Sequence, residues 1–455
     1  MPGNRFEMVA TELDDAGWGV GLGEGKRVHV ADLLPGERAE VAIDHVSPHK
    51  PEAWAHLVRW IGERSAERAK PACPAFGRCG GCSWQHMAYP AQLVAKRARV
   101  VAALADVPAV RAGTVTIRDA HPSPAIVGYR NKGKYVVGRA HERLVLGAYA
   151  PRSHHVIDTV GCRVVAPIID EVASWVRGAA EEAGLGAYDE GTRSGELRYV
   201  IVREAAGDVL VVLVHTTETP RSKLESVATA MAKHTAVHGV VSVANDRRDG
   251  SIVPAGSRAQ VLFGAGSLVE DLGGVGVEVG AGEFVQVNRA QAAVLYARIA
   301  ELAGARAGLR AVDLYAGLGG IGIALARAGA AVVAVERDRD AVAALTRAAE
   351  SAHLPLVVIA ADAGSLTAEL RRPLGNRPDV VVVNPPRKGL DAGARALLAD
   401  LAPATLIYVS CGPEALARDL AALAAAGYAP DVIEPFDLMP GTAQIETVVR
   451  LRPAA

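Results

Sequence analysis

The spacing of apolar and polar positions divides the chain into three regions with different predicted folds. Within residues 1–60, apolar and polar side chains alternate in short runs at 6–13, 26–30 and 39–46. Glycines and the turn Leu34-Pro35-Gly36-Glu37 separate these runs. Because short strands joined by glycine turns are typical of small β-barrels, we predict an N-terminal β-barrel over residues 1–60.

The second region, residues 61–300, mixes two kinds of periodicity. Strand-like alternation and helical repeats follow one another irregularly, with strands expected at 135–150, 198–204 and 209–215 and helices at 91–104, 167–184 and 221–234. Irregular succession favours an α+β domain over a regular α/β sheet.

From residue 301 to residue 455 short apolar runs alternate with amphipathic ones. Strands are expected at 309–314, 331–336, 357–362, 379–384, 405–411 and 448–451, with helices at 321–328, 339–351, 391–401 and 414–426. Strands that alternate with helices predict an α/β fold with a doubly wound, parallel sheet.

The composition fits a large folded protein. Half of the 455 residues are apolar and 22% are charged, so the chain can bury a sizeable core. No apolar run reaches the ~18 residues that a membrane helix needs, and residues 1–9 lack the apolar stretch of a secretion signal. Five thinly spread cysteines argue against a secreted disulfide framework. We therefore expect a cytoplasmic, monomeric protein that does not bind membranes.

Positive charge is concentrated in two segments, although the formal net charge is −1. Residues 50–99 carry nine Lys and Arg against three Glu, and residues 125–163 carry seven against two acidic residues. A single such run usually forms a solvated face. Two runs that both flank cysteines favour an anionic partner such as RNA.

A glycine turn, Asp313 to Gly320, follows a predicted strand and opens a predicted helix. Glycines at such a turn, here Gly317, Gly319 and Gly320, let the backbone approach a ligand, and the helix N-terminus offers free N–H groups. Glu336 follows the next strand, where an acidic side chain typically binds ribose hydroxyls. The alternative is an ordinary tight turn, but the combination favours a nucleoside cofactor.

Two further motifs end predicted parallel strands, where ligands bind in α/β sheets. Asn384-Pro385-Pro386-Arg387 follows one strand and is either a rigid binding loop or a simple strand terminator. Cys411 follows another strand and precedes a helix, whose N-terminus lowers a thiol pKa. It is a candidate nucleophile, the alternative being a buried apolar thiol.

Three cysteines lie within ten residues at Cys73, Cys79 and Cys82, and Cys162 is the remaining one outside the C-terminal region. A tetrahedral zinc takes four nitrogen or sulfur ligands, and an iron–sulfur cluster takes four thiolates. Four cysteines without an obligatory histidine favour the cluster, with unrelated thiols as the alternative.

Two weaker candidates complete the set. Phe284, Gln286 and Asn288 share one face of a short predicted strand. Glu446 precedes the last predicted strand, where an isolated carboxylate is usually solvated.

Taken together, these motifs resemble the bacterial RNA uridine-5 methyltransferases, specifically the iron–sulfur 23S ribosomal RNA type with an N-terminal TRAM domain. The resemblance covers nearly the whole chain, from the turn at 34–37 through Cys79-Gly80-Gly81-Cys82 to the motifs between 284 and 446. It implies a class I methyltransferase domain that uses S-adenosylmethionine. It also implies an RNA substrate, with 23S rRNA favoured and tRNA as the alternative.

The resemblance assigns roles to individual residues. S-adenosylmethionine would lie against Gln286, Asp313, Tyr315, Gly317, Gly319, Gly320, Glu336, Asp362 and Asn384, and a [4Fe–4S] cluster would be held by Cys73, Cys79, Cys82 and Cys162. The Cys411 thiolate would add to C6 of the uracil, and Glu446 would remove the C5 proton. Phe284, Asn288 and Arg387 would contact the target nucleotide.

The chain departs from the family pattern at four positions. Asn384 stands where Asp is common, Gly412 where Asn is usual, and Gly441 and Gln444 where His is usual. Two other functions compete with uridine C5 methylation. Asn-Pro-Pro also occurs in exocyclic N-methyltransferases, which do not need Cys411. A non-catalytic iron–sulfur RNA-binding protein would bind RNA without methyl transfer.

Overall fold

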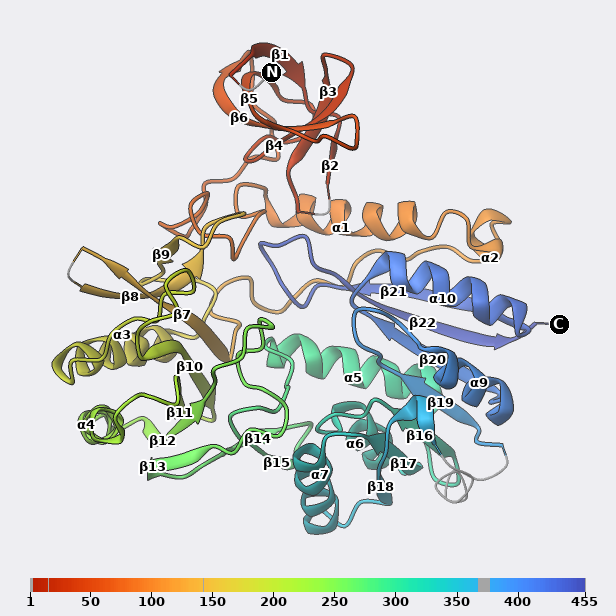
Figure 1. Cartoon of the computed structure of the whole chain (residues 1–455). Coiled ribbons are helices and arrows are strands. Elements are labelled where there is room, and N and C mark those ends of the chain that lie inside the picture. Colours follow the sequence, from red (N-terminus) through yellow and green to blue (C-terminus); the bar gives the residue numbers. More distant parts are fainter. Residues whose placement is uncertain (1–2, 15, 142, 367–376, 455) are drawn as a thin grey trace.

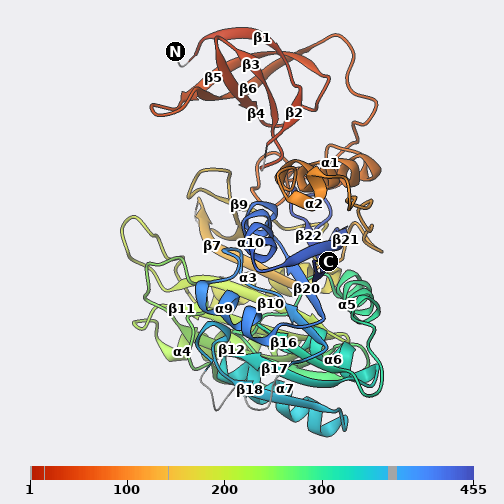
Figure 2. The ribbon, with the colours of Figure 1, turned by 90° about the vertical axis from the view of Figure 1, so that its right-hand side faces the viewer.

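The computed structural model describes residues 3–14, 16–141, 143–366 and 377–454. An N-terminal sheet stands at one end of the molecule, above two larger sheets that lie side by side (Figure 1). A view from the side shows the same separation, with α1 and α2 between the N-terminal sheet and the rest (Figure 2).

The N-terminal sheet closes on itself. Its six strands follow the order β1-β5-β6-β4-β3-β2, with bounds β1 Arg5–Val9, β2 Glu12–Leu13, β3 Gly19–Gly23, β4 Lys26–Val30, β5 Arg38–Val46 and β6 Glu52–Ile61. Only two residues separate β1 from β2, yet β1 pairs with β5 and β2 pairs with β3. This one stretch therefore joins both ends of the sheet into a barrel, as the alternation predicted.

Strand β3 was not predicted, because glycines occupy alternate positions in it. A Cβ on Gly19 would lie 2.3 Å from the Leu33 carbonyl oxygen, and one on Gly21 would lie 2.2 Å from that of Val9. The glycines therefore permit close approach of backbones inside a small barrel, which is a packing requirement and not a turn signal.

The central sheet has seven strands in the order β13-β12-β11-β10-β7-β8-β9. Their bounds are β7 Lys132–Ala140, β8 Arg143–Tyr149, β9 Val156–Asp158, β10 Leu197–Ala205, β11 Asp208–His215, β12 Val237–Ala244 and β13 Gln260–Gly264. Helices α3 (Pro167–Glu182) and α4 (Arg221–Met231) pack their apolar faces on it in one buried cluster. The expected α+β character of this region is confirmed.

The C-terminal sheet follows the order β18-β17-β16-β19-β20-β22-β21. Its strands are β16 Arg310–Leu314, β17 Ala331–Glu336, β18 Leu356–Ala360, β19 Val380–Val383, β20 Thr405–Ser410, β21 Tyr428–Phe436 and β22 Glu446–Pro453. The first five are parallel, whereas β22 runs antiparallel to β20 and β21. The doubly wound α/β fold is therefore confirmed, with an antiparallel hairpin at one edge.

Helices cover both faces of this sheet. One buried cluster contains side chains of α5 (Arg289–Ala303), α6 (Gly320–Arg327) and α7 (Arg339–Ser351). It also contains side chains of β15 (Gly276–Val279), which pairs with β14 (Leu268–Asp271). The other contains side chains of α1 (Tyr89–Ala103), α9 (Ala392–Leu401) and α10 (Pro413–Ala425). Short helices α2 (Pro108–Arg111) and η1 (Ala363–Ser365) complete the described elements.

Segments that precede residue 300 also pack on the C-terminal sheet. Helix α1 packs on the C-terminal sheet, and residues 117 and 121 form bridges with β21. Helix α5 also packs against this sheet. Within the described residues, we find no helix with the length and apolarity required to cross a membrane.

Candidate active site

Two adjoining cavities open at the carboxyl edge of the C-terminal parallel strands, where ligands of doubly wound sheets bind. Their volumes are about 480 and 430 Å³. They share part of their lining, namely Phe284, Tyr315, Gly317, Leu318 and Pro386. Phe284 is 69% exposed and stands at the rim of both. One continuous cleft therefore passes from β17 and β18 to β20 and β22.

The glycine turn forms the floor of this cleft. Tyr315, Gly317 and Gly319 all have positive φ angles, of 63°, 56° and 85°. Gly320 begins α6 and lines the first cavity, where an added Cβ would lie 2.5 Å from the ring of Tyr296. The turn therefore leaves backbone at the cavity wall, as a nucleoside-binding turn requires.

Substitution of Gly319 by alanine tests whether this turn is strained without glycine. The new Cβ would lie 2.3 Å from a methyl group of Leu345, in a left-handed conformation that itself costs about 1–3 kcal/mol. We expect the free energy of unfolding in urea to fall by at least that amount. The matched control is Gly178→Ala on α3, where no atom lies within 4 Å of the new methyl group. It should be neutral or slightly stabilising.

The second cavity carries the acidic residues expected beside a ribose. Glu336 lies at the end of β17 and accepts hydrogen bonds of 2.8 Å from the N–H groups of Gly317, Arg337 and Asp338. Asp362 follows β18 and lies 3.6 Å from the Arg337 guanidinium. Both carboxylates line the cavity, so hydroxyl donors of a nucleoside would meet acceptors here.

Three of the predicted contact residues do not line the cleft: Gly319 lies against Leu345, and the side chains of Asp313 and Asn288 lie beneath the cleft. Asp313 is 1% exposed and accepts a 2.8 Å hydrogen bond from the Gly322 N–H inside α6, and burial raises its pKa to about 7. Asn288 is fully buried and caps α5 by accepting from the Gln291 N–H. Its amide donates to Ser123 and to the Leu438 carbonyl. Both side chains hold the elements that form the cleft.

The first cavity brings three ionisable side chains together. Cys411 directly follows β20, Arg387 ends the Asn384 motif after β19, and Glu446 begins β22. Gln286 and Asn384 line the same cavity. These residues come from distant parts of the chain and meet because the parallel strands end at one edge and β22 lies beside β20.

The environment of Cys411 corrects one expectation. Burial raises the pKa of its thiol and the nearby Glu446 raises it further, whereas the Arg387 guanidinium lowers it. The helix N-terminus was expected to lower this pKa, but the balance of burial and charge has the opposite sign. Formation of the thiolate therefore depends on Arg387 and on ligands that complete the site.

Glu446 is suited to accept a proton. Burial raises its pKa to about 7, and the charge of Arg387 only partly offsets this effect. A carboxylate with a pKa near the working pH combines a useful ionised fraction with appreciable basicity. The Glu446 carboxylate is therefore desolvated, whereas its isolated position before the last predicted strand is more typical of a solvated group.

Tyr296 lines the first cavity but was not singled out from the sequence. It lies on α5, and burial raises the pKa of its hydroxyl, with Asp313 and Glu446 adding to the effect. In the sequence, an isolated tyrosine in an amphipathic helix indicates a core residue. Only the approach of α5 to Gly320 reveals that it faces the cleft.

The four cysteines outside the C-terminal sheet line a third cavity of about 450 Å³. Arg130 and Lys132 lie in its wall, and the Arg130 charge lowers the thiol pKa of Cys79 and Cys82 against the larger raising effect of burial. This cavity shares wall residues with the first one, namely Phe284, Val285, Arg387 and Met439. In the described part of the chain, no group of three or more His, Cys, Asp or Glu side chains could hold a metal ion.

Comparisons with known proteins find related RNA methyltransferases. Residues 277–453 match the family model described as tRNA (Uracil-5-)-methyltransferase. The chain is 34% identical to an uncharacterized RNA methyltransferase of Geobacter sulfurreducens, over 99% of this chain and 90% of that protein. It is 32% identical to one of Halalkalibacterium halodurans, over 99% and 98% of the two chains.

The fold also matches a solved structure. The crystal structure of a Pyrococcus abyssi tRNA (uracil-54, C5)-methyltransferase, in complex with S-adenosyl-L-homocysteine, superimposes with a TM-score of 0.77. The match covers 98% of this chain and 99% of that one, at 24% sequence identity. The similarity extends over the whole arrangement of sheets and establishes the fold.

Proposed function

Because the chain belongs to the family of RNA uracil-5 methyltransferases, we propose that it methylates C5 of a uridine through a covalent adduct with Cys411. The single observation that carries this mechanism is the meeting of Cys411, Arg387 and Glu446 in one cavity that adjoins the nucleoside cleft. A nucleophile, a cation that favours its anionic form and a base of raised pKa are then all within reach of one pyrimidine ring.

Uracil C5 is a weak nucleophile, which is why the reaction needs a thiolate. The Cys411 thiolate forms a bond to C6, and the electron pair of the C5–C6 bond becomes an enolate. S-adenosylmethionine, when bound, would supply the methyl group: C5 forms its new bond to that carbon as the bond from the carbon to the sulfonium sulfur breaks, and S-adenosylhomocysteine is the leaving group. Glu446 then takes the C5 proton, the C5–C6 double bond reforms, and the C6–sulfur bond breaks to release the thiolate.

The cleft residues divide between the cofactor and the nucleotide. Gln286, Tyr315, Gly317, Gly320, Glu336, Asp362 and Asn384 would hold S-adenosylmethionine, with Asp313 and Gly319 supporting the turn from below. The exposed ring of Phe284 is placed to stack on a splayed base. Arg387 would contact the uracil beside the thiol. Asn288 would act indirectly, by capping α5 beneath the cleft.

A single assay tests the reaction. RNA labelled with tritium at uridine C5 should release tritium only when S-adenosylmethionine is present. Methyl transfer without tritium release would indicate methylation of an exocyclic nitrogen. RNA binding with neither event would indicate a non-catalytic RNA-binding protein. Either of these outcomes overturns the proposal.

We further propose that Cys73, Cys79, Cys82 and Cys162 hold a [4Fe–4S] cluster. The donors fit in type and number, since four free thiols line one cavity beside the Arg130 guanidinium. A tetrahedral zinc ion also accepts four thiolates, so zinc is the alternative that the purified protein must exclude. A [4Fe–4S] cluster takes four thiolates, and these four cysteines would be its ligands.

Purification without oxygen tests the metal. We expect broad visible absorbance and about four iron atoms per chain, both lost in Cys162→Ser. Stoichiometric zinc without this absorbance would overturn the assignment.

The N-terminal barrel and the two basic segments are proposed to bind RNA, the barrel as a TRAM domain. Arg152 of the second segment lies 4.5 Å from the ring of Trp18 and 6.0 Å from that of Trp54, so this segment is continuous with the barrel surface. 23S rRNA is the favoured substrate. Mapping of 5-methyluridine after incubation with 23S rRNA and with tRNA separates these two substrates.

A further inference from the structure

The loop between β21 and β22, residues 437–445, delivers Glu446 to the first cavity. Leu438, Met439, Gln444 and Ile445 of this loop line the cavity directly. Any shift of the loop therefore moves the carboxylate relative to the uracil. The described contacts that hold the loop come largely from a part of the chain more than 300 residues away.

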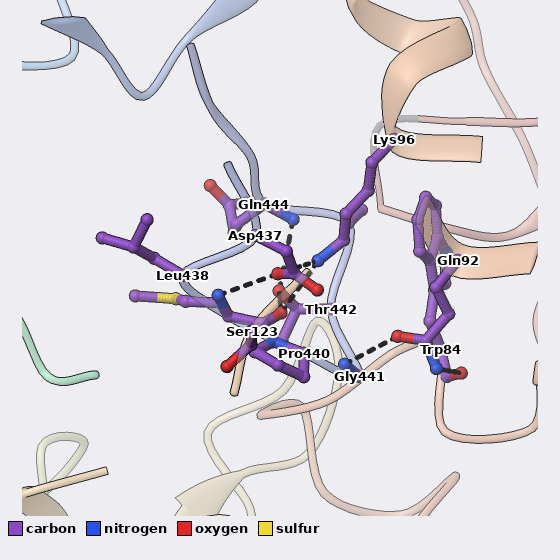
Figure 3. Close-up of polar contacts among 12 residues, drawn as sticks. Trp84, Gln92, Lys96, Ser123, Asp437, Leu438, Pro440, Gly441, Thr442 and Gln444 are labelled. Atoms are coloured by element: carbon purple, nitrogen blue, oxygen red, sulfur yellow. Dashed lines mark hydrogen bonds and ion pairs between the residues drawn. The ribbon is translucent and has the colours of Figure 1, made fainter. Parts of the chain in front are cut away.

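Helix α1 supplies the first of these contacts. The Lys96 ammonium lies 2.5 Å from the Asp437 carboxylate, and both side chains are fully buried. Lys96 also donates a 3.0 Å hydrogen bond to the Met439 carbonyl, while Asp437 accepts one from the Met439 N–H. The pair thus fixes the first turn of the loop (Figure 3).

Gln92 supplies the second contact and joins the loop to the cysteine segment. Its side-chain oxygen accepts a 2.8 Å hydrogen bond from the Gly441 N–H, and its amide donates to the Trp84 and Met87 carbonyls. The Gly441 carbonyl in turn accepts from the N–H groups of Ser83 and Trp84, at 3.1 and 2.9 Å. Figure 3 shows Gln92 placed between Trp84 and Gly441.

Packing alone does not explain why the loop is held by a buried ion pair and buried hydrogen bonds, because these contacts cost desolvation free energy. Burying an ion pair carries a large desolvation penalty, and apolar side chains of similar volume commonly stabilise a fold at least as well. What the polar contacts add is a fixed register between the loop and its support. Ser83 directly follows Cys82, so the support begins one residue after a proposed cluster ligand.

We propose that Gln92 and Lys96 are positioning residues for proton abstraction. Both hold the loop that carries Glu446, and Gln92 also joins this loop to the segment that follows Cys82. This inference rests on the proposed function, in which Glu446 acts after methyl transfer. When the base is displaced, thiol addition and methyl transfer continue but the C5 proton stays in place. Methylated RNA then accumulates as a covalent adduct on Cys411.

The experiment compares two signals in the full-length protein, using C5-tritiated RNA and S-adenosylmethionine with a labelled methyl group. In the unaltered protein, methyl transfer and tritium release should be equal. In Gln92→Met, tritium release should slow by about tenfold, less than the 10²–10⁴-fold loss expected without the base. Methyl label should remain with the protein in denaturing gels. A loss of folding would instead lower both signals together.

Control variants make the outcome decisive. Arg97→Met on the same helix removes hydrogen bonds to the carbonyls of Ile117 and Arg118, and it should keep the ratio of the two signals. The double variant Lys96→Met/Asp437→Leu replaces the ion pair by apolar side chains and should accumulate adduct even if Gln92→Met does not fold. Glu446→Gln is the reference for a missing base.

The possible failures are distinguishable. If Glu446→Gln accumulates no adduct, the proposed function is at fault. If Glu446→Gln accumulates adduct while Gln92→Met and the double variant fold and release tritium at the normal rate, the positioning role is overturned.

Discussion

The Cys411→Ala variant is expected to lose tritium release and methyl transfer together, by about 10³-fold or more. Without the thiolate there is no bond to C6, and C5 of an intact uracil ring is too weak a nucleophile to take the methyl group. The measurement is the single-turnover rate of both signals on RNA carrying the target uridine. No covalent protein–RNA band should form in denaturing gels.

Binding of S-adenosylmethionine supplies the control for this variant. Cys411 is assigned to the nucleotide and not to the cofactor, and it does not line the second cavity, where Glu336 and Asp362 lie. The affinity of Cys411→Ala for the cofactor should therefore equal that of the unaltered protein. Normal methyl transfer by a folded Cys411→Ala would contradict the covalent mechanism and favour methylation of an exocyclic nitrogen.

The residues that end parallel strands were the most predictable part of the site. Tyr315, Glu336, Asn384 and Cys411 each follow a short apolar run, and parallel strands bring their carboxyl ends to one edge. Strand periodicity and one topological rule therefore predict that these side chains meet.

Features that depend on contacts between distant segments were not predictable. Asp313 has the position of a ligand-binding residue in its motif, but its carboxylate turns inward to the Gly322 N–H. Pro430 and Pro435 argue against a strand at residues 428–436. The structure nevertheless has β21 there, because prolines are tolerated in a strand at the edge of a sheet. Helix α1 supports the loop that carries Glu446, but the two segments are far apart in the sequence and no periodic pattern indicates that they meet.

Glu446→Gln is the second variant with a large expected effect. The amide keeps the size of the side chain but does not accept the C5 proton, so turnover should fall by about 10²–10⁴-fold. Thiol addition and methyl transfer do not need this base. The variant should therefore retain methylated RNA bound to Cys411, visible as a covalent band that is absent in Cys411→Ala.

Glu434→Gln is the matched control for this substitution. Glu434 is a fully buried glutamate on β21, the strand paired with β22, but it binds Arg298 and Arg118 and does not line the cavity. Its replacement should lower stability by removing the charge that pairs with these two arginines, while leaving no trapped adduct. A covalent band in Glu434→Gln would show that trapping reports general damage to the hairpin.

The pH dependence gives an independent signature of Glu446. Its pKa of about 7 means that the carboxylate loses its proton, and becomes able to act, as the pH rises through 7. The rate of tritium release from preformed adduct should therefore rise with pH and level off above 7, falling about tenfold per unit below 6. This step no longer needs the Cys411 thiol to ionise, so its raised pKa does not distort the profile. In Glu446→Gln the inflection near 7 should vanish; a retained inflection would assign the proton transfer to another group.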